Sequence, residues 1–111
     1  VNTMKRGCLT WVVIGATVGW GAASSVAASP QLSQKAGCAA CHAIDQKSLG
    51  PSYQAIAQRY RGRADAPALL AGRVRKGSQG VWGAVPMPPT APDRLPDAEV
   101  KALVAWLLKT P

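Results

Sequence analysis

Apolar residues recur at helical spacing in the last part of the chain. Asp97 and Glu99 open this segment, and apolar residues then follow at intervals of three and four. The apolar positions are Val100, Leu103, Val104, Leu107 and Leu108. Acidic side chains favour the positive end of a helix dipole, and such a stripe is typical of a helix with one buried face. We therefore predict a helix that begins near Asp97.

Three shorter helices are predicted upstream. The first opens at Ser29, directly before a proline, and runs toward Cys38. Ser52 is a good cap for the second. The third begins near Asp65 and ends at Gly77, with basic residues in its last turn. Their apolar positions are Tyr53, Ile56, Ala57 and Tyr60 in the second helix, and Leu69, Leu70 and Val74 in the third.

The segments between these helices read as loops. Residues 48–51 form a short loop, and residues 78–93 are rich in glycine and proline and have no periodicity. No segment alternates in the way that predicts a strand. The fold class that follows is all-α.

The N-terminal segment has the organisation of a signal peptide. Lys5 and Arg6 precede an apolar stretch over 9–18 and a run of small residues over 21–28, and no charged residue occurs from 7 to 34. This order predicts a signal peptide over 1–28, cleaved after Ala28, and a single mature domain over 29–111. An uncleaved membrane anchor is the alternative, because 7–28 is long enough to span a bilayer. The small residues in its second half favour cleavage.

Cys38, Cys41 and His42 form a C-x-x-C-H motif, the attachment signal for c-type haem. Two intervening residues place the sulfurs about one helical turn apart, which suits addition to the two haem vinyl groups. The adjacent imidazole can then take one axial position on iron. A zinc site would need about four ligands, and a thioredoxin-like redox pair would need a βαβ context. Neither is evident, although a chance occurrence of the motif remains an alternative.

The charge of the mature segment points to an acidic partner. The whole chain has 13 Lys and Arg against 5 Asp and Glu; removing Lys5 and Arg6 leaves 11 against 5, a net charge of +6. This favours an acidic protein or a membrane surface over an acidic enzyme substrate. No Lys/Arg-rich run or series of stacking aromatics supports nucleic-acid binding.

The second axial ligand is predicted by counting soft donors. His42 is the only histidine, and Met87 is the only methionine after the predicted cleavage site. Met87 lies between Pro86 and Pro88, which stiffen the loop around its sulfur. We therefore predict Met87 as the second axial ligand. An open iron or a lysine-ligated iron is the alternative.

With these segments in view, the chain resembles the small bacterial class I cytochromes c, especially the cytochrome c-551 type. The matching segments are residues 37–45, Gly50 and Pro51, residues 76–83, residues 86–89, and the closing helix around Trp106. They span essentially the whole mature chain in the same order. The resemblance implies about four helices wrapped around one covalently bound haem c.

The resemblance also implies roles for individual residues. Pro51 matches a proline whose carbonyl accepts a hydrogen bond from the ligating histidine, which orients its ring. Arg73 and Trp82 match positions that donate to a buried haem propionate. Gly37 and Trp106 match the crossing of the terminal helices.

Two positions depart from the family pattern. Thr90 stands where relatives often carry an asparagine that hydrogen-bonds near the methionine sulfur, so the resemblance does not imply the fine tuning of the iron potential. Ser33 stands near the usual place of an aromatic residue, so weaker packing is expected there.

The function expected from these residues is one-electron transfer. Histidine and thioether ligation saturates the iron and raises its potential. The resemblance implies a monomeric periplasmic carrier between respiratory complexes, with nitrite reductase or a terminal oxidase as acceptor, no nucleic acid, and no stable membrane insertion after cleavage. If Met87 were not a ligand, the alternative would be a haem enzyme or gas-binding protein with peroxidase-like activity.

Overall fold

The computed structural model describes residues 30–111, which form four α-helices and one 3₁₀ turn. These elements are α1 (Pro30–Lys35), η1 (Cys38–Ala40), α2 (Tyr53–Tyr60), α3 (Ala66–Lys76) and α4 (Asp97–Leu108). Within this range there is no strand, only an isolated antiparallel bridge between Ser78 and Met87. The all-α prediction is confirmed. The predicted signal peptide over 1–28 lies outside the described residues.

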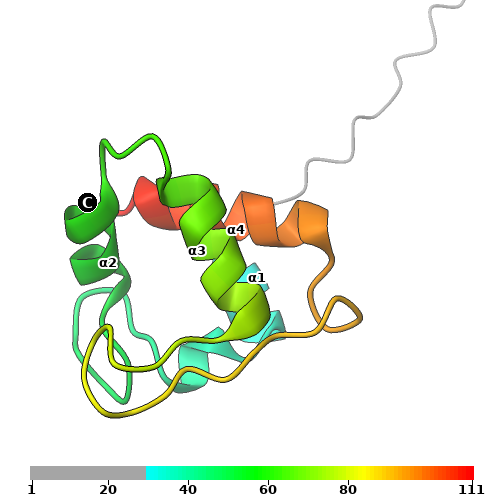
Figure 1. Cartoon of the computed structure of the whole chain (residues 1–111), viewed down its shortest axis with the longest axis horizontal. Coiled ribbons are helices and arrows are strands. Elements are labelled where there is room, and N and C mark those ends of the chain that lie inside the picture. The colour runs from blue at the N-terminus through cyan, green and yellow to red at the C-terminus, as the bar shows by residue number, and fades with distance from the viewer. Residues whose placement is uncertain (1–29) are drawn as a thin grey trace, which may run out of the picture.

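Helix α4 holds the core together because it contacts the other three α-helices. In Figure 1, α3 passes in front of α4, while the loop from α3 to α4 runs along the opposite edge of the molecule. The predicted stripe of α4 is buried at Val100, Leu103, Val104 and Leu107. The face that these residues form packs against Ile56 of α2 and Leu70 of α3 in one core cluster. Burial of such side chains stabilises the fold by about 1.5–3 kcal/mol each.

The helix ends follow local sequence signals. Ser52 caps α2, because its hydroxyl accepts a hydrogen bond from the amide of Ala55 at 3.1 Å. Helix α3 ends before Gly77, which has a φ of 75° and a ψ of −178°. Helix α1 ends at Lys35, and Gly37 then turns the chain with a φ of 80° before Cys38.

Helices α1 and α4 lie against each other, and Gly37 follows directly after the end of α1. A Cβ added at Gly37 would meet the guanidinium of Arg94, with Nη2 at 3.1 Å. Trp106 packs edge-on against Tyr53, with ring centroids 5.2 Å apart. The expectation that Gly37 and Trp106 lie at the crossing of the terminal helices stays a prediction. On the surface, Lys35 joins the two helices through an ion pair with Glu99 at 2.9 Å.

Ser33 makes a polar contact where the family pattern has an aromatic residue. Its side chain is buried, and its hydroxyl accepts a 2.9 Å hydrogen bond from the hydroxyl of Tyr53. Burial raises the pKa of Tyr53 above its usual value. A buried tyrosine hydroxyl needs such a partner, so the serine gives α1 and α2 a specific contact in place of aromatic packing.

The loop between α3 and α4 contributes to the core as well as to the surface. Leu95 is completely buried and belongs to the same cluster as the α4 stripe. Leu95 follows the segment 78–93 that was predicted to be a loop, and a single buried residue leaves no periodic pattern in the sequence. Leu95 ties the last part of the loop to the helices.

Candidate functional site

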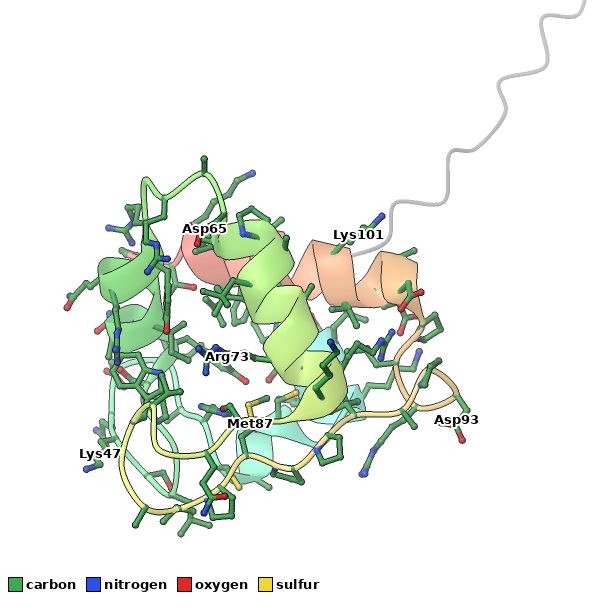
Figure 2. The ribbon with its side chains drawn as sticks, viewed as in Figure 1. Lys47, Asp65, Arg73, Met87, Asp93 and Lys101 are labelled. Atoms are coloured by element: carbon green, nitrogen blue, oxygen red, sulfur yellow. The ribbon has the colours of Figure 1, made fainter. Side chains whose placement is uncertain are left out.

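One cavity of about 310 Å³ is lined by all the residues singled out in the sequence as candidates for binding a cofactor. They are Cys38, Cys41, His42, Pro51, Arg73, Trp82 and Met87. The volume lies at the lower end of the roughly 300–1,000 Å³ typical of cofactor sites. In Figure 2, Arg73 on α3 and Met87 on the following loop extend into the same central region of the molecule. Tertiary folding therefore gathers candidates from distant segments into one place.

The two cysteines and the histidine project from one tight turn. The amides of Cys41 and His42 both donate to the carbonyl of Cys38, each at 3.0 Å. Neither Cys38 nor Cys41 forms a disulfide. Burial raises the pKa of the Cys38 thiol, while a backbone hydrogen bond and the Arg94 guanidinium act in the opposite direction. Two sulfurs and an imidazole are thus held on one wall of the cavity.

The imidazole of His42 is fixed by its surroundings. Its Nδ1 lies 2.7 Å from the carbonyl oxygen of Pro51. A carbonyl can only accept, so Nδ1 carries the proton and Nε2 keeps a free lone pair. Tyr53 stacks on the ring at a centroid distance of 5.6 Å and an interplanar angle of 24°. A Cβ added at Gly50 would lie 2.7 Å from the ring carbon Cε1, so the chain approaches the imidazole as closely as only glycine permits.

Backbone hydrogen bonds hold the Pro51 carbonyl in place. The amide of Gly50 donates to the carbonyl of Cys41 at 2.8 Å, and the amide of Tyr53 donates to that of Ala43 at 2.9 Å. These two hydrogen bonds anchor the chain just before and just after Pro51. The orientation of the His42 ring is therefore set by backbone structure rather than by a mobile side chain.

Met87 reaches the cavity from the loop after α3. Its amide donates to the carbonyl of Ser78 at 2.8 Å, and its carbonyl accepts from the amide of Ser78 at 3.0 Å. Gly77 lies directly against this pair: a Cβ there would overlap the Met87 carbonyl oxygen and lie 3.1 Å from the nitrogen of Pro89. The end of α3 thus determines where the Met87 backbone lies.

Arg73 and Trp82 contribute polar groups to the same cavity. Nε of Arg73 is buried and has no hydrogen-bond partner within the described residues. A buried guanidinium nitrogen without an acceptor is costly, so this atom fits an anionic group in the cavity. Trp82 is 37% exposed, and the guanidinium of Arg59 lies 4.6 Å from the centre of its ring. Arg59 also donates to the carbonyl of Val81 at 3.1 Å.

The sequence did not indicate three of these contacts. Arg59 over Trp82, Tyr53 on His42 and Arg94 beside Cys38 each join segments distant in sequence. Tyr53 was recognised only as an apolar position of a helix. The two arginines had no distinguishing local pattern, since an isolated basic residue usually lies on a solvated surface.

The donor set fits haem better than a bare metal ion. Among residues 30–111, no three His, Cys, Asp or Glu side chains gather in a way that could hold a metal. Instead, one imidazole, one thioether and two thiols line a largely apolar cavity that also contains an unpaired buried guanidinium nitrogen. These are the types of group that a c-type haem requires: soft donors for its iron, thiols for covalent attachment and a cationic partner for its carboxylates. The fold and the site together define a c-type haem protein.

The family model described as Cytochrome c matches residues 26–111, and the chain belongs to this family. Cytochrome c2 of Rubrivivax gelatinosus is 58% identical over 81 residues, which cover 73% of this chain and 95% of that protein. Cytochrome c-552 of Hydrogenobacter thermophilus is 47% identical over 88 residues, which cover 79% of this chain and 87% of that protein. The segment that the family model matches, 26–111, includes all of the described residues.

The fold is shared with solved structures. The crystal structure of wild-type Nitrosomonas europaea cytochrome c552 superposes with a TM-score of 0.70 at 41% identity, over 75% of this chain and all of that one. The chain is thus a small class I cytochrome c with one covalently bound haem c. It is an electron carrier and not an enzyme.

Proposed function

We propose that Cys38 and Cys41 hold the haem through thioether bonds and that His42 and Met87 are its axial ligands. The observation that carries this proposal is the cavity that all four side chains line. In the proposed site, Arg73 and Trp82 bind a propionate, and Pro51 orients His42 through its carbonyl.

Each residue contributes through its own geometry. The haem, when bound, supplies one-electron chemistry at iron. Because Nδ1 of His42 donates to Pro51, Nε2 is the nitrogen free to act as a ligand. The backbone hydrogen bonds between Met87 and Ser78 hold Met87 in the loop after α3, which lines the cavity separately from the turn that carries His42. Two protein ligands leave no coordination position for peroxide or oxygen, which suits a carrier.

An absorption spectrum of the oxidised and reduced holoprotein tests this ligand set. We expect a weak red band in the oxidised protein, which is characteristic of thioether ligation to ferric c-type haem. We also expect that haem remains with the protein after denaturation, because thioether bonds are covalent. An oxidised spectrum without the red band would contradict Met87 ligation.

We further propose that residues 1–28 are a cleaved signal peptide and that the mature protein works in the periplasm. None of the helices in residues 30–111 is long and apolar enough to cross a membrane.

The net charge of +6 after residue 28 favours partners with acidic surfaces, among which we place nitrite reductase or a terminal oxidase. The mass of the purified protein tests cleavage, and oxidation by each purified partner tests the acceptor.

Arg73→Gln is expected to shift the pH dependence of the reduction potential. If Arg73 faces a propionate, losing its positive charge raises the pKa of that carboxyl group. In the wild type, the potential should fall as pH rises through this pKa, because the ionised carboxylate stabilises the ferric form, and then level off. The falling part should therefore move to higher pH in the variant. Redox titrations across mildly acidic to neutral pH measure this.

The matched control for this titration is Arg63→Gln. Arg63 carries the same charge but pairs with Asp65 on the surface and does not line the cavity. It should leave the pH-dependent range in place. If Arg73→Gln behaved like this control, Arg73 would not be a propionate partner.

A further inference from the structure

Arg75 connects α3 to the loop that carries Met87. Its Nη1 donates to the carbonyl of Thr90 at 3.1 Å, and its Nη2 donates to the carbonyl of Leu95. Nε and Nη2 also bind the Asp97 carboxylate, at 2.9 and 2.6 Å. The Arg75 side chain is only 19% exposed, and its two carbonyl contacts are partly buried, whereas its contact with Asp97 is exposed. One guanidinium thus serves three acceptors along the loop and at the start of α4.

The two backbone contacts matter more than the ion pair. The Asp97 side chain is 81% exposed, and exposed ion pairs contribute little to stability. Leu95, in contrast, is completely buried, so its carbonyl depends on a protein donor. The fork of the guanidinium supplies donors in two directions, which the ammonium of a lysine cannot reproduce.

Thr90 is held at both of its backbone groups. Its amide donates to the carbonyl of Val74 at 2.8 Å, and its carbonyl accepts from Arg75. Three residues earlier, Met87 is held at both backbone groups by Ser78. Only Pro88 and Pro89 lie between, and both have a restricted φ. The segment 87–90 is therefore a stiff link attached at both ends to α3 and the residue that follows its C-cap.

We propose that Arg75 is a positioning residue that keeps the Met87 sulfur directed at the iron. By holding Thr90, it limits the excursions of the 87–90 segment that would let the thioether leave. This inference rests on the proposed ligand role of Met87. It assigns Arg75 a role in the lifetime of the iron–sulfur bond, beyond its support of the fold.

The test compares Arg75→Lys and Arg75→Gln with the wild-type holoprotein. The first readout is the rate at which the ferric protein binds saturating cyanide, which must wait for the thioether to leave. We expect this rate to rise about tenfold or more in both variants, the effect of losing one charge-assisted hydrogen bond. The second readout is hydrogen exchange at the Thr90 amide, which should accelerate while exchange at the Ile56 amide of α2 stays unchanged.

Two controls separate position from charge. Asp97→Asn removes the ion pair but leaves the carbonyl contacts of Arg75, so the cyanide rate should stay within about twofold of wild type. Arg63→Gln removes a surface arginine whose forked pairing with Asp65 lies outside the loop, and it should also have no effect. Arg75→Lys retains the charge and decides the question if Arg75→Gln does not fold.

The results distinguish failure of the positioning role of Arg75 from failure of the ligand role of Met87. An unchanged cyanide rate in Arg75→Lys would overturn the positioning role, even if the melting temperature fell. Equal acceleration of exchange at Thr90 and Ile56 would also overturn it, because the effect would then be global. If the wild type lacked the red band and Met87→Ala did not change cyanide binding, the ligand assignment would fail instead. Thr90 exchange would still report on Arg75 in that case.

Discussion

Met87→Ala is expected to lower the reduction potential by roughly 0.2 V, a substantial part of the ~0.8 V range that axial ligands span. A thioether favours ferrous iron, so its loss stabilises the ferric state. Covalent attachment should persist, because Cys38, Cys41 and His42 are unchanged. The variant should also bind carbon monoxide and cyanide rapidly. Redox titration and ligand-binding kinetics measure the two effects.

The control for this variant is Val85→Ala in the same loop. Val85 lines the cavity but is 62% exposed, so its truncation should leave the reduction potential and ligand access nearly unchanged. If Met87→Ala kept the wild-type potential and excluded carbon monoxide and cyanide, the proposed axial ligand would be wrong.

Gly77→Ala is expected to destabilise the holoprotein by about 3 kcal/mol. Two causes combine. The φ of 75° with a ψ of −178° is a conformation open essentially to glycine alone. An added Cβ would also overlap the Met87 carbonyl, which cannot move without breaking its bridge to Ser78. Urea denaturation measures the loss, and the red band should weaken because the Met87 loop is displaced.

Two other glycines separate these causes. Gly80 also has a φ of 75° but nothing within 4 Å of an added Cβ, so Gly80→Ala should show the cost of a positive φ without a steric overlap. Gly72 lies inside α3 with open space around it, and Gly72→Ala should be neutral or stabilising by up to about 1 kcal/mol. If the free energy of unfolding of Gly77→Ala were no lower than that of Gly80→Ala, the steric contact with the Met87 loop would not contribute to the loss of stability.

Both predictions concern the way α3 supports the following loop. Gly77 lets the Met87 backbone approach the end of α3 closely. Ser78 forms hydrogen bonds with Met87, and Arg75 donates one to Thr90. In the proposed site, the second axial ligand therefore depends on α3 as much as on its own segment. The attachment turn, in contrast, is held by its own backbone hydrogen bonds and by Gly50.

Helix positions could be predicted because their causes are local. Ser52 caps α2 through a residue three positions away, and the α4 stripe depends only on periodicity. The first helix runs toward Cys38 as predicted, but its end at Lys35, ahead of the left-handed Gly37, was not specified by the sequence pattern. The hydrogen bond between Ser33 and Tyr53, twenty positions away, was not predicted. A side-chain partner at that separation has no signature in either local segment.

Motif spacing and the count of soft donors pointed from the sequence alone to a c-type haem, because covalent attachment requires two thiols and a histidine within five residues. The tertiary structure decided how the rest of the cavity is built. It places Arg94 beside Cys38, Arg59 over Trp82 and Arg75 on the Met87 loop. These contacts arise where separate segments meet, so they depend on the path of the whole chain around the core. The local motif thus indicates the cofactor, while packing between distant segments determines how the residues around its cavity are positioned.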